Sequence, residues 1–442
     1  MTKTISTKDM IVIGLMLFAL FFGAGNLVFP VMLGQLAGTA VSEAAIGFLL
    51  TGVGLPLLGV IAFSISGQPD LLSLTNRVHP IFGLIFTTTL YLTIGPLFAM
   101  PRTGSVSYEI AIKPFLTEQD NAIPLFLFTI SFFALSCFLS LNPSKMIDIV
   151  GKWLTPLLIT FMAILALTTL LYPLGQPMAP QVKYESYPFF QGFQEGYLTM
   201  DALAALVFGI IVINAIKDKG AHSPKLLLQT GIKSSILAAA ILAVIYFVLA
   251  YIGASSVEKL NYLANGGEVL AQISQHYYGT YGGIILGIIV LLACLTTAIG
   301  LTTACSSYLQ SLIPHISYKT YAVLLSLVSA LLANAGLNDL IQISEPVLKI
   351  LYPLAIVLML LTFFHPLFKG KRQVYWFSLT FTFLVSIVEG LSSSKLKIVS
   401  LTNLYSDYLP LFDIGLGWII PALIGAILGF IWPVSKRRNE AI

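Results

Sequence analysis

Long apolar runs alternate with short polar segments along the whole chain. A helix needs about 20 apolar residues to cross the hydrocarbon core of a bilayer, and twelve runs of about that length can be counted. The runs are continuous, which excludes the alternating strands of a membrane β-barrel. We therefore predict an all-α polytopic membrane protein with twelve transmembrane helices, which span residues 9–33, 43–66, 81–100, 123–141, 149–173, 195–216, 226–254, 281–312, 318–335, 340–364, 373–391 and 411–433.

Composition and charge agree with a membrane protein and predict its orientation. Of the 442 residues, 57% are hydrophobic and only 10% are Asp, Glu, Lys or Arg, against about 25% charged residues in soluble domains. Lys and Arg gather in cytoplasmic loops. With both termini cytoplasmic, 16 of the 23 basic residues fall on that side, which explains the net charge of +4 without a nucleic-acid partner. They are Lys3, Lys8, Arg77, Lys145, Lys152, Lys217, Lys219, Lys225, Lys233, Lys319, Lys369, Lys371, Arg372, Lys436, Arg437 and Arg438.

The first span is interrupted by residues that suit a helix poorly. It contains Gly23, Gly25, Asn26 and Pro30 within one apolar run, and glycine and proline both destabilise a helix interior. Broken backbone at membrane depth is tolerated where it is buried in protein or lines a cavity. One interpretation is an unwound site, whose free amides bind a carboxylate and whose free carbonyls bind a cation. The alternative is a close-packed Gly-x-Gly with a harmless kink.

The sixth span carries a second interruption, next to an acidic residue. Asp201 follows Gly196 and Thr199 in an otherwise apolar run. A charged residue at the centre of a span costs about 2.5–3.5 kcal/mol on insertion scales, so such residues tend to mark transport pathways. Asp201 could instead lie near the outer end of the span, in water or capping the helix. Interruptions at matching places in two halves of a chain indicate an inverted-repeat transporter.

The eighth span is rich in hydroxyl groups. Such hydroxyls usually bond back to a carbonyl in the preceding turn of the helix. A cluster that faces the broken first span could instead give oxygen ligands to a small, hard cation. The hydroxyl residues are Thr296, Thr297, Thr302, Thr303, Ser306 and Ser307.

The remaining charged residues of the spans have several interpretations. Arg102 and Glu109 could form a gating network or lie at the external interface. Glu345 and Lys349 are four residues apart, which predicts an ion pair along one helix. Glu389 closes the eleventh span and is predicted to lie at the membrane interface.

Signatures of catalysis and metal binding are missing from the sequence. Cys137, Cys294 and Cys305 form no CxxC or Cys/His cluster, and the five histidines are scattered without an HExxH motif. A membrane-embedded enzyme would need a nucleophile with a base, or a set of metal ligands, at one depth. A channel would show repeated pore-lining motifs, and none is found. We therefore expect a transporter that is not an enzyme.

Three segments make the chain similar to a known family. They are FGAGNLVFP from Phe22, GPLFAMPRT from Gly95, and Thr199-Met200-Asp201 followed by Leu203-Ala204-Ala205. Over essentially its whole length the chain resembles the BrnQ-type branched-chain amino acid:cation symporters of the amino acid–polyamine–organocation superfamily. The resemblance implies one transmembrane domain in a bacterial inner membrane, with the five-plus-five inverted repeat of the leucine transporter. Residues 9–173 and 195–364 would form the two repeats, and residues 373–433 two peripheral helices.

The same resemblance implies where the ligands bind. A Na⁺ site is expected between first-span carbonyls near Ala19 and Phe22 and the eighth-span residues Ala293, Thr296 and Thr297. The substrate carboxylate would meet amides of the first break, its ammonium group the sixth-span carbonyls and Asp201, and its side chain an apolar pocket. The substrate-binding residues so implied are Ala24, Gly25, Asn26, Thr199, Asp201, Ala202 and Phe208. No cofactor besides the coupling ion and no obligate protein partner is implied.

The substrate and the coupling ion are expected to be a branched-chain amino acid and Na⁺. A hydrophobic pocket resolves one methylene by only about 1–3 kcal/mol, so one carrier shared by leucine, isoleucine and valine is expected. Hydroxyls at Thr296 and Thr297 favour Na⁺, because they do not titrate, whereas a proton-coupled carrier would use Asp201. Val28 replaces the arginine of the leucine-transporter branch, so a different external gate is expected. A transporter of the same fold for another solute, such as proline, is the alternative.

Overall fold

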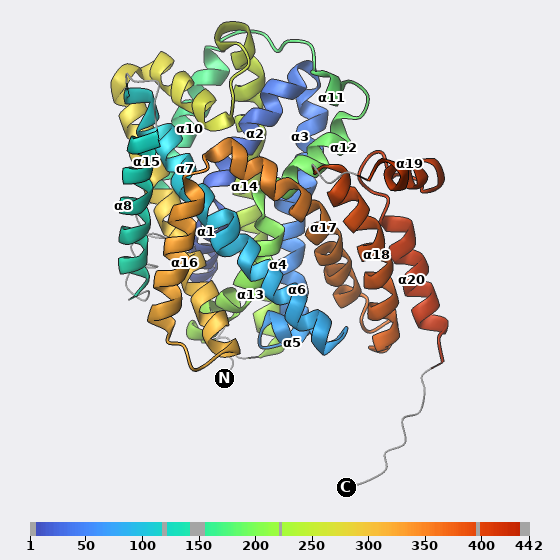
Figure 1. The fold of residues 1–442 in the computed structure, drawn as a ribbon. Coiled ribbons are helices and arrows are strands. Elements are labelled where there is room, and N and C mark those ends of the chain that lie inside the picture. The colour runs from blue at the N-terminus through green and yellow to red at the C-terminus, as the bar shows by residue number, and fades with distance from the viewer. Residues whose placement is uncertain (1–5, 117–121, 142–154, 221–222, 395–397, 434–442) are drawn as a thin grey trace.

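The computed structural model describes residues 6–116, 122–141, 155–220, 223–394 and 398–433, and every regular element in those ranges is a helix (Figure 1). The predicted all-α class is confirmed. Some predicted features lie outside the described residues. They are the start of the fifth span, residues 149–154, and the basic residues Lys3, Lys145, Lys152, Lys436, Arg437 and Arg438.

Several of the helices are interrupted by irregular turns. The longer helices are α1 (Thr7–Phe21), α2 (Ala24–Ala37), α3 (Val41–Leu49), α4 (Leu55–Ser66), α5 (Leu71–Thr75), α6 (Pro80–Leu92), α7 (Ala99–Ala111), α8 (Ala122–Ser140), α10 (Thr155–Leu171), α11 (Val182–Glu185), α12 (Pro188–Glu195), α13 (Asp201–Asp218), α14 (Pro224–Leu260), α15 (Gly266–Leu312), α16 (Tyr318–Ala333), α17 (Leu337–Phe363), α18 (Arg372–Ser392), α19 (Val399–Tyr408) and α20 (Ile419–Ile431). The short turns are η1 (Gly38–Ala40), η2 (Leu50–Gly54), η3 (Thr93–Leu97), η4 (Lys113–Phe115) and η7 (Gly196–Thr199).

Most of the predicted spans correspond to apolar helices of suitable length. Among the described residues, seven helical runs are long and apolar enough to cross a membrane: Ala24–Ser66, Pro80–Phe115, Ala122–Ser140, Lys225–Leu260, Gly266–Leu312, Leu337–Phe363 and Arg372–Ser392. Three shorter apolar helices are Pro156–Leu171, Tyr318–Ala333 and Ile419–Ile431. The predicted first and sixth spans are not single helices, because one is broken between α1 and α2 and the other between α12 and α13. The number of twelve crossings stays a prediction.

One of two predicted span boundaries differs from the structure, and the other agrees with it. The sixth span was expected from residue 195, but α12 already begins at Pro188, where proline fits the first turn of a helix. The predicted start of the eighth span at residue 281 agrees with the structure, because α15 consists of two helical stretches that meet at a bend at Gly279. Gly279 has a φ of 62°, a left-handed conformation that glycine adopts without steric cost.

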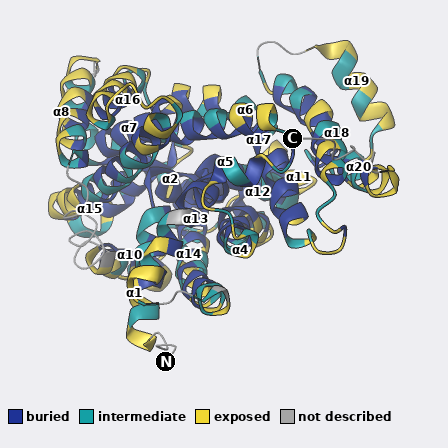
Figure 2. Ribbon diagram, turned by 90° about the horizontal axis from the view of Figure 1, so that it is seen from below, coloured by how far each residue is buried: buried dark blue, intermediate teal, exposed yellow. Residues whose placement is uncertain are grey.

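The outer surface of the molecule is rich in large apolar side chains. Figure 2 shows exposed residues on the outward faces of peripheral helices such as α8 and α16, and buried residues around α2. Ile81, Phe138 and Ile431 have 63%, 69% and 71% of their surface exposed. Many exposed apolar side chains around helices of this length suit contact with the hydrocarbon core of a bilayer.

Helix α18 packs between α17 and α20, and these helices form one flank of the molecule (Figure 1). Helix α2, in contrast, lies in the middle of the bundle and packs against α14 and α15. Of its 14 residues, 12 are buried. The fold therefore places the end of α2 that follows the first break deep inside the protein.

Glycines bring the backbones of α2 and α14 into direct contact. A Cβ atom on Gly34 would lie 1.8 Å from the carbonyl oxygen of Ala250, and one on Gly253 would lie 2.0 Å from that of Val31. Small residues at such crossings are typical of helix interfaces in membranes. This contact fixes α2, and with it the break in the first span.

Replacing Gly253 with valine should therefore destabilise the protein. The new side chain would force the two backbones apart, and overpacking of this kind costs about 1–3 kcal/mol or more. We expect a lower temperature of thermal unfolding for the purified variant in detergent. Gly300→Val is the matched control, because a Cβ on Gly300 meets nothing within 4 Å. Equal unfolding temperatures for the two variants would contradict the backbone contact.

Candidate functional site

The first span is broken within the membrane-crossing bundle, as predicted. Helix α1 ends at Phe21 and α2 begins at Ala24, so Phe22 and Gly23 lie in non-helical conformations. The amide of Gly23 donates to Oδ1 of Asn26 at 3.1 Å. The next amides, at the start of α2, have no intrahelical acceptor, because the first four N–H groups of any helix lack one. The break therefore presents backbone donors in the interior of the protein.

The sixth span is broken in the same way. The turn η7 ends at Thr199, Met200 adopts a left-handed conformation with φ 64°, and α13 begins at Asp201. The hydroxyl of Thr199 donates to the carbonyl of Gly196 at 2.9 Å and accepts the amide of Asp201 at 3.3 Å. Asp201 has only 3% of its surface exposed. The interpretation of Asp201 as a water-exposed residue at the outer end of the span is therefore wrong.

A hydrogen-bond network joins the two breaks. The side-chain amide of Asn26 donates to Oδ2 of Asp201 at 2.5 Å and also contacts the hydroxyl of Tyr246. Tyr246, from α14, donates to the same carboxylate oxygen at 3.0 Å. All three side chains are buried. The carboxyl group of Asp201, at the start of α13, is therefore linked by hydrogen bonds to the start of α2 and to α14.

Arg102 reaches the same region from α7. Its Nη1 donates to the carbonyl of Leu198 at 2.5 Å, its Nη2 donates to the hydroxyl of Ser344 at 3.0 Å, and its guanidinium carbon lies 4.9 Å from the ring centre of Phe29. Of the two interpretations of Arg102 and Glu109, the network does not form, because Glu109 pairs with Lys113 at 2.8 Å instead. Arg102 thus contacts residues next to both breaks.

These elements enclose a pocket, called here the central pocket. Charged and polar groups line one part of it and apolar side chains the rest. Its lining residues are Leu20, Phe21, Gly23, Ala24, Gly25, Asn26, Ile94, Ala99, Arg102, Thr103, Thr199, Met200, Asp201, Ala204, Phe208, Thr297 and Leu301. The pocket therefore combines backbone amides, one acidic and one basic side chain, and an apolar wall.

One of the two hydroxyls predicted to bind a cation, that of Thr297, lies beside the first break. Thr297 lines the central pocket, and its Oγ1 would be 3.2 Å from a Cβ atom on Gly23. Thr296 and Thr297 donate to the carbonyl of Ala293 at 2.8 Å and 3.1 Å, the back-bonding expected of hydroxyls in a membrane helix. Na⁺ prefers such oxygen ligands, so the residue types fit the ion.

The sequence matches one protein family almost from end to end. The model of the family described as "Branched-chain amino acid transport protein" matches residues 6–436. The chain belongs to this family.

Family members of known name support the same assignment. The chain is 55% identical over 440 residues to "Branched-chain amino acid permease BrnQ" of Bacillus subtilis (strain 168), and 46% identical over 444 residues to BraB of the same organism, with all of each chain covered. It is 37% identical over 440 residues to BrnQ of Escherichia coli (strain K12), with 99% of each chain covered. These relatives are permeases, which confirms the expectation of a bacterial membrane transport protein rather than an enzyme.

Solved structures share the fold. The inward facing conformation of Mhp1 matches with a TM-score of 0.61 at 15% identity, covering 95% of this chain and 90% of that chain. MhsT in complex with L-phenylalanine matches with a TM-score of 0.57 at 16% identity, covering 97% and 99%. At such identities the likeness concerns the fold alone. The family member described here therefore has the helical fold of these two transporters.

The structure brings most of the predicted substrate-binding residues together. Six of them line the central pocket, whereas Ala202 is buried elsewhere. Successive residues of a helix point about 100° apart, so Ala202 turns away from the pocket that Asp201 faces. The six are Ala24, Gly25, Asn26, Thr199, Asp201 and Phe208.

Of the residues predicted to bind the cation, only Thr297 lines the central pocket. Ala19 is half-buried, and Phe22 stacks on Phe18 and Tyr246 with ring centres 5.0 Å and 6.5 Å apart. Arg102 was not predicted from the sequence to bind substrate, and Tyr246 was not predicted to belong to the site. The only signal for Tyr246 was a polar atom in the middle of an apolar run.

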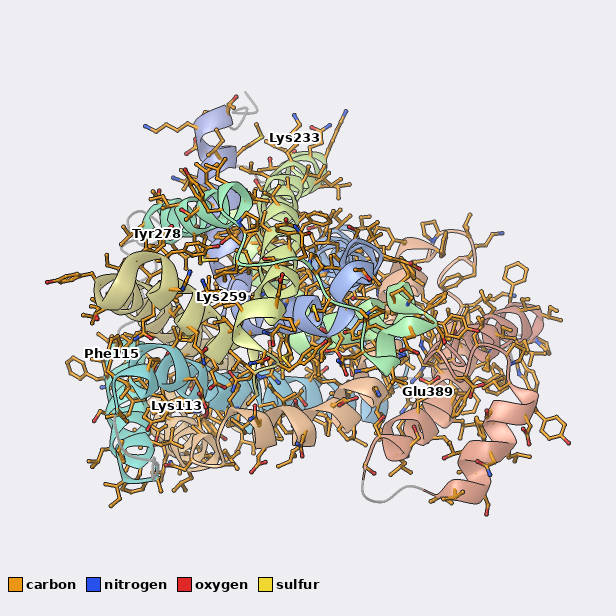
Figure 3. The ribbon with its side chains drawn as sticks, turned by 90° about the horizontal axis from the view of Figure 1, so that it is seen from above. Lys113, Phe115, Lys233, Lys259, Tyr278 and Glu389 are labelled. Atoms are coloured by element: carbon orange, nitrogen blue, oxygen red, sulfur yellow. The ribbon has the colours of Figure 1, made fainter. Side chains whose placement is uncertain are left out.

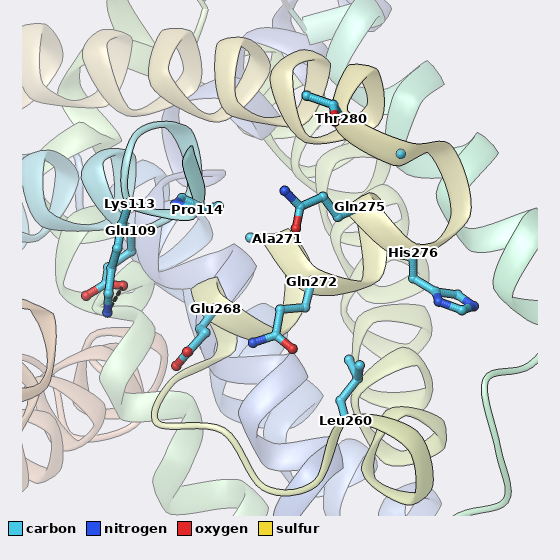
Figure 4. A pocket seen from close by; sticks show the side chains of 11 residues that line it. Glu109, Lys113, Pro114, Leu260, Glu268, Ala271, Gln272, Gln275, His276 and Thr280 are labelled. Atoms are coloured by element: carbon cyan, nitrogen blue, oxygen red, sulfur yellow. Dashed lines mark hydrogen bonds and ion pairs between the residues drawn. The ribbon is translucent and has the colours of Figure 1, made fainter. Parts of the chain in front are cut away.

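A second pocket lies away from both breaks, near the bend of α15 (Figure 4). Its Glu109 and Lys113 are already paired with each other, and it shares no residue with the central pocket. Its lining residues are Glu109, Lys113, Pro114, Leu260, Glu268, Ala271, Gln272, Gln275, His276, Gly279 and Thr280. The central pocket is the better candidate, because it joins the two broken helices.

The other charged residues of the spans have structural partners. Glu345 and Lys349 form the predicted ion pair at 2.9 Å. Glu389 is buried and accepts the amide of Gly417 at 3.0 Å, and its position at the membrane interface stays a prediction. Figure 3 shows Glu389 on the flank formed by α17, α18 and α20, across the molecule from Lys113. Neither group belongs to the central pocket.

Proposed function

We propose that the protein imports leucine, isoleucine and valine by symport with a cation, and that the central pocket binds the amino acid. The make-up of this pocket carries the proposal. Arg102 and Asp201 provide opposite charges, and a branched-chain amino acid likewise joins two opposite charges to a short apolar side chain. The apolar wall consists of Leu20, Phe21, Ile94, Ala204, Phe208 and Leu301.

Transport would follow alternating access, in which two repeats rock around a fixed site. We assign residues 9–173 and 195–364 to the repeats and residues 373–433 to two peripheral helices. The paired breaks and the fold shared with Mhp1 and MhsT support this assignment. The distribution of basic residues supports a place in the bacterial inner membrane with both termini cytoplasmic.

The proposed coupling ion is Na⁺, bound beside the first break. Its ligands would be the carbonyls of Ala19, Phe22 and Ala293 and the hydroxyls of Thr296 and Thr297. The position of Thr297 beside Gly23 supports this site. One positive charge that moves inward gains about 2.3 kcal/mol per 100 mV of membrane potential, enough for roughly 50-fold accumulation. Coupling to protons is the second candidate, because Asp201 is the one carboxylate among the pocket-lining residues.

The test is uptake of radiolabelled leucine by proteoliposomes that carry a sodium gradient, a proton gradient or neither. We expect the sodium gradient to drive uptake, and unlabelled isoleucine and valine to compete while proline does not. Uptake driven by the proton gradient alone would assign coupling to Asp201. No leucine uptake under either gradient would refute the function.

Replacing Thr297 with alanine should raise the sodium concentration for half-maximal uptake by about tenfold. A lost oxygen ligand weakens binding of the ion by an energy similar to that of a hydrogen bond to a charged group. Thr303→Ala is the matched control, since Thr303 also bonds back within α15, to the carbonyl of Ile299 at 2.8 Å, but does not line the pocket. Unchanged sodium dependence of Thr297→Ala would remove Thr297 from the cation site.

A further inference from the structure

Arg102 is a buried charge without a counter-charge. Only 2% of its surface is exposed, and within the described part of the chain no carboxylate lies at ion-pair distance from it. Burial of an unpaired charge is costly, and the contact with the ring of Phe29 offsets only part of that cost. The position of Arg102 is therefore best explained if a negative group joins it during function.

Most of the hydrogen-bonding capacity of Arg102 is unused. A guanidinium group has five N–H donors. One of them, on Nη1, bonds to the carbonyl of Leu198, and another, on Nη2, bonds to Ser344. The Nε atom has no partner among the described residues. The two existing bonds hold the guanidinium group in place, while the remaining donors stay available for an acceptor.

The guanidinium group faces the first break. Its Nη1 would be 3.5 Å from a Cβ atom on Gly25, and both residues line the central pocket. Gly25 belongs to the first turn of α2, a helix of 14 residues. The amides of such a turn, together with the helix dipole, favour an anion. Two independent features, an unsaturated buried arginine and a free helix N-terminus, thus converge on one place.

We propose that Arg102 binds the α-carboxylate of the transported amino acid, together with the first amides of α2. This inference rests on the proposed function and adds the residue that recognises the acid group. A guanidinium group and a carboxylate pair through two parallel hydrogen bonds. Asp201 lines the same pocket without an ion pair to Arg102, so the ammonium group of the substrate meets Asp201. The two charged ends of the amino acid are then each matched by an opposite charge.

The test compares leucine with leucinamide, which keeps the ammonium group and the side chain but replaces the carboxylate by a neutral amide. Dissociation constants of both are measured by calorimetry on purified wild-type protein and on Arg102→Gln, Arg102→Lys and Lys113→Gln. Lys113→Gln is the control for loss of a positive charge just beyond α7, outside the central pocket. A hydrogen-bonded charge pair of this kind is worth roughly a 10- to 100-fold preference for leucine in the wild type.

We expect Arg102→Gln to weaken leucine binding roughly 10- to 100-fold and to leave leucinamide binding within about threefold of the wild type. The preference for leucine over leucinamide is then abolished. Lys113→Gln should keep it. If Arg102 only clamps η7 to α17, Arg102→Gln weakens both ligands alike or changes neither, and either result overturns the proposal. The proposal also fails if the wild type binds both ligands equally. If Arg102→Gln does not fold, the test uses Arg102→Lys, because a lysine cannot form two parallel hydrogen bonds to a carboxylate. If Arg102→Lys keeps the full preference for leucine over leucinamide, the proposal is overturned. A wild type that binds no leucine refutes the proposed function instead.

Discussion

Replacing Asp201 with asparagine should lower leucine uptake by roughly 10- to 100-fold while the protein still folds and inserts. A single oxygen of Asp201 accepts both the amide of Asn26 and the hydroxyl of Tyr246, and the amide oxygen of asparagine can accept the same two bonds. The substitution therefore removes the charge and keeps the geometry. Hydrogen bonds to a charged group contribute about 1.5–3 kcal/mol, which gives the expected range. The measurement is the initial rate of uptake into proteoliposomes, normalised to the amount of inserted protein.

Tyr246→Phe is the matched control for the charge of Asp201. It deletes one of the two donors to the carboxylate and leaves the charge and the bond from Asn26 in place, so we expect a smaller decrease than for Asp201→Asn, of about 2- to 10-fold. If Asp201→Asn transports leucine within about threefold of the wild type, the charge is not used. Asp201 would then bind neither the ammonium group nor a coupling proton.

The two breaks could be predicted from sequence because their causes are local. Gly23, Gly25 and Pro30 weaken a helix wherever they stand, and α1 does end just before them. The burial of Asp201 could not be predicted in the same way. It comes from contacts with Asn26 and Tyr246, which are 175 and 45 residues away in sequence.

The partners of the charged residues could not be predicted, because they come from distant parts of the chain. Leu198 and Ser344 are 96 and 242 residues away from Arg102 in sequence. A network of Arg102 with Glu109 was one interpretation of the sequence, but Lys113 is one turn from Glu109 and pairs with it. The spacing of apolar residues predicts which face of a helix points into the protein. It does not determine which other helix packs against that face.

The cation site shows a further limit of local patterns. Hydroxyls three and four residues after Ala293 suit ion ligands, yet the same spacing lets each hydroxyl bond to the carbonyl of Ala293. Both outcomes use the same atoms, so spacing alone does not separate them. The tertiary contact that favours a ligand role is the approach of Thr297 to Gly23. That contact depends on how α15 packs against the first break.

Replacing Gly25 with leucine should abolish leucine binding, with a loss of more than about 100-fold, while the protein still inserts. A Cβ atom at this position would already lie 3.0 Å from the ring of Phe29 and 3.5 Å from Nη1 of Arg102. The further carbons of a leucine side chain would occupy the space in which Arg102 and the first amides of α2 meet the carboxylate. Leucine would lose both the space for its carboxylate and the charge-assisted hydrogen bonds to that group, so its affinity should fall steeply. The measurement is the dissociation constant of leucine on purified protein.

Gly300→Leu is the matched control, because it introduces the same side chain into a helix where a Cβ meets nothing within 4 Å. It should bind leucine within about threefold of the wild type. The comparison distinguishes an effect of filling the pocket from an effect of replacing any glycine inside a helix. Gly25→Ala should fall between the two, because a single methyl group displaces the ring of Phe29 and leaves most of the pocket open. Leucine binding retained by Gly25→Leu would show that the substrate binds outside the central pocket, since no rearrangement of Phe29 alone makes room for four added carbons beside Arg102.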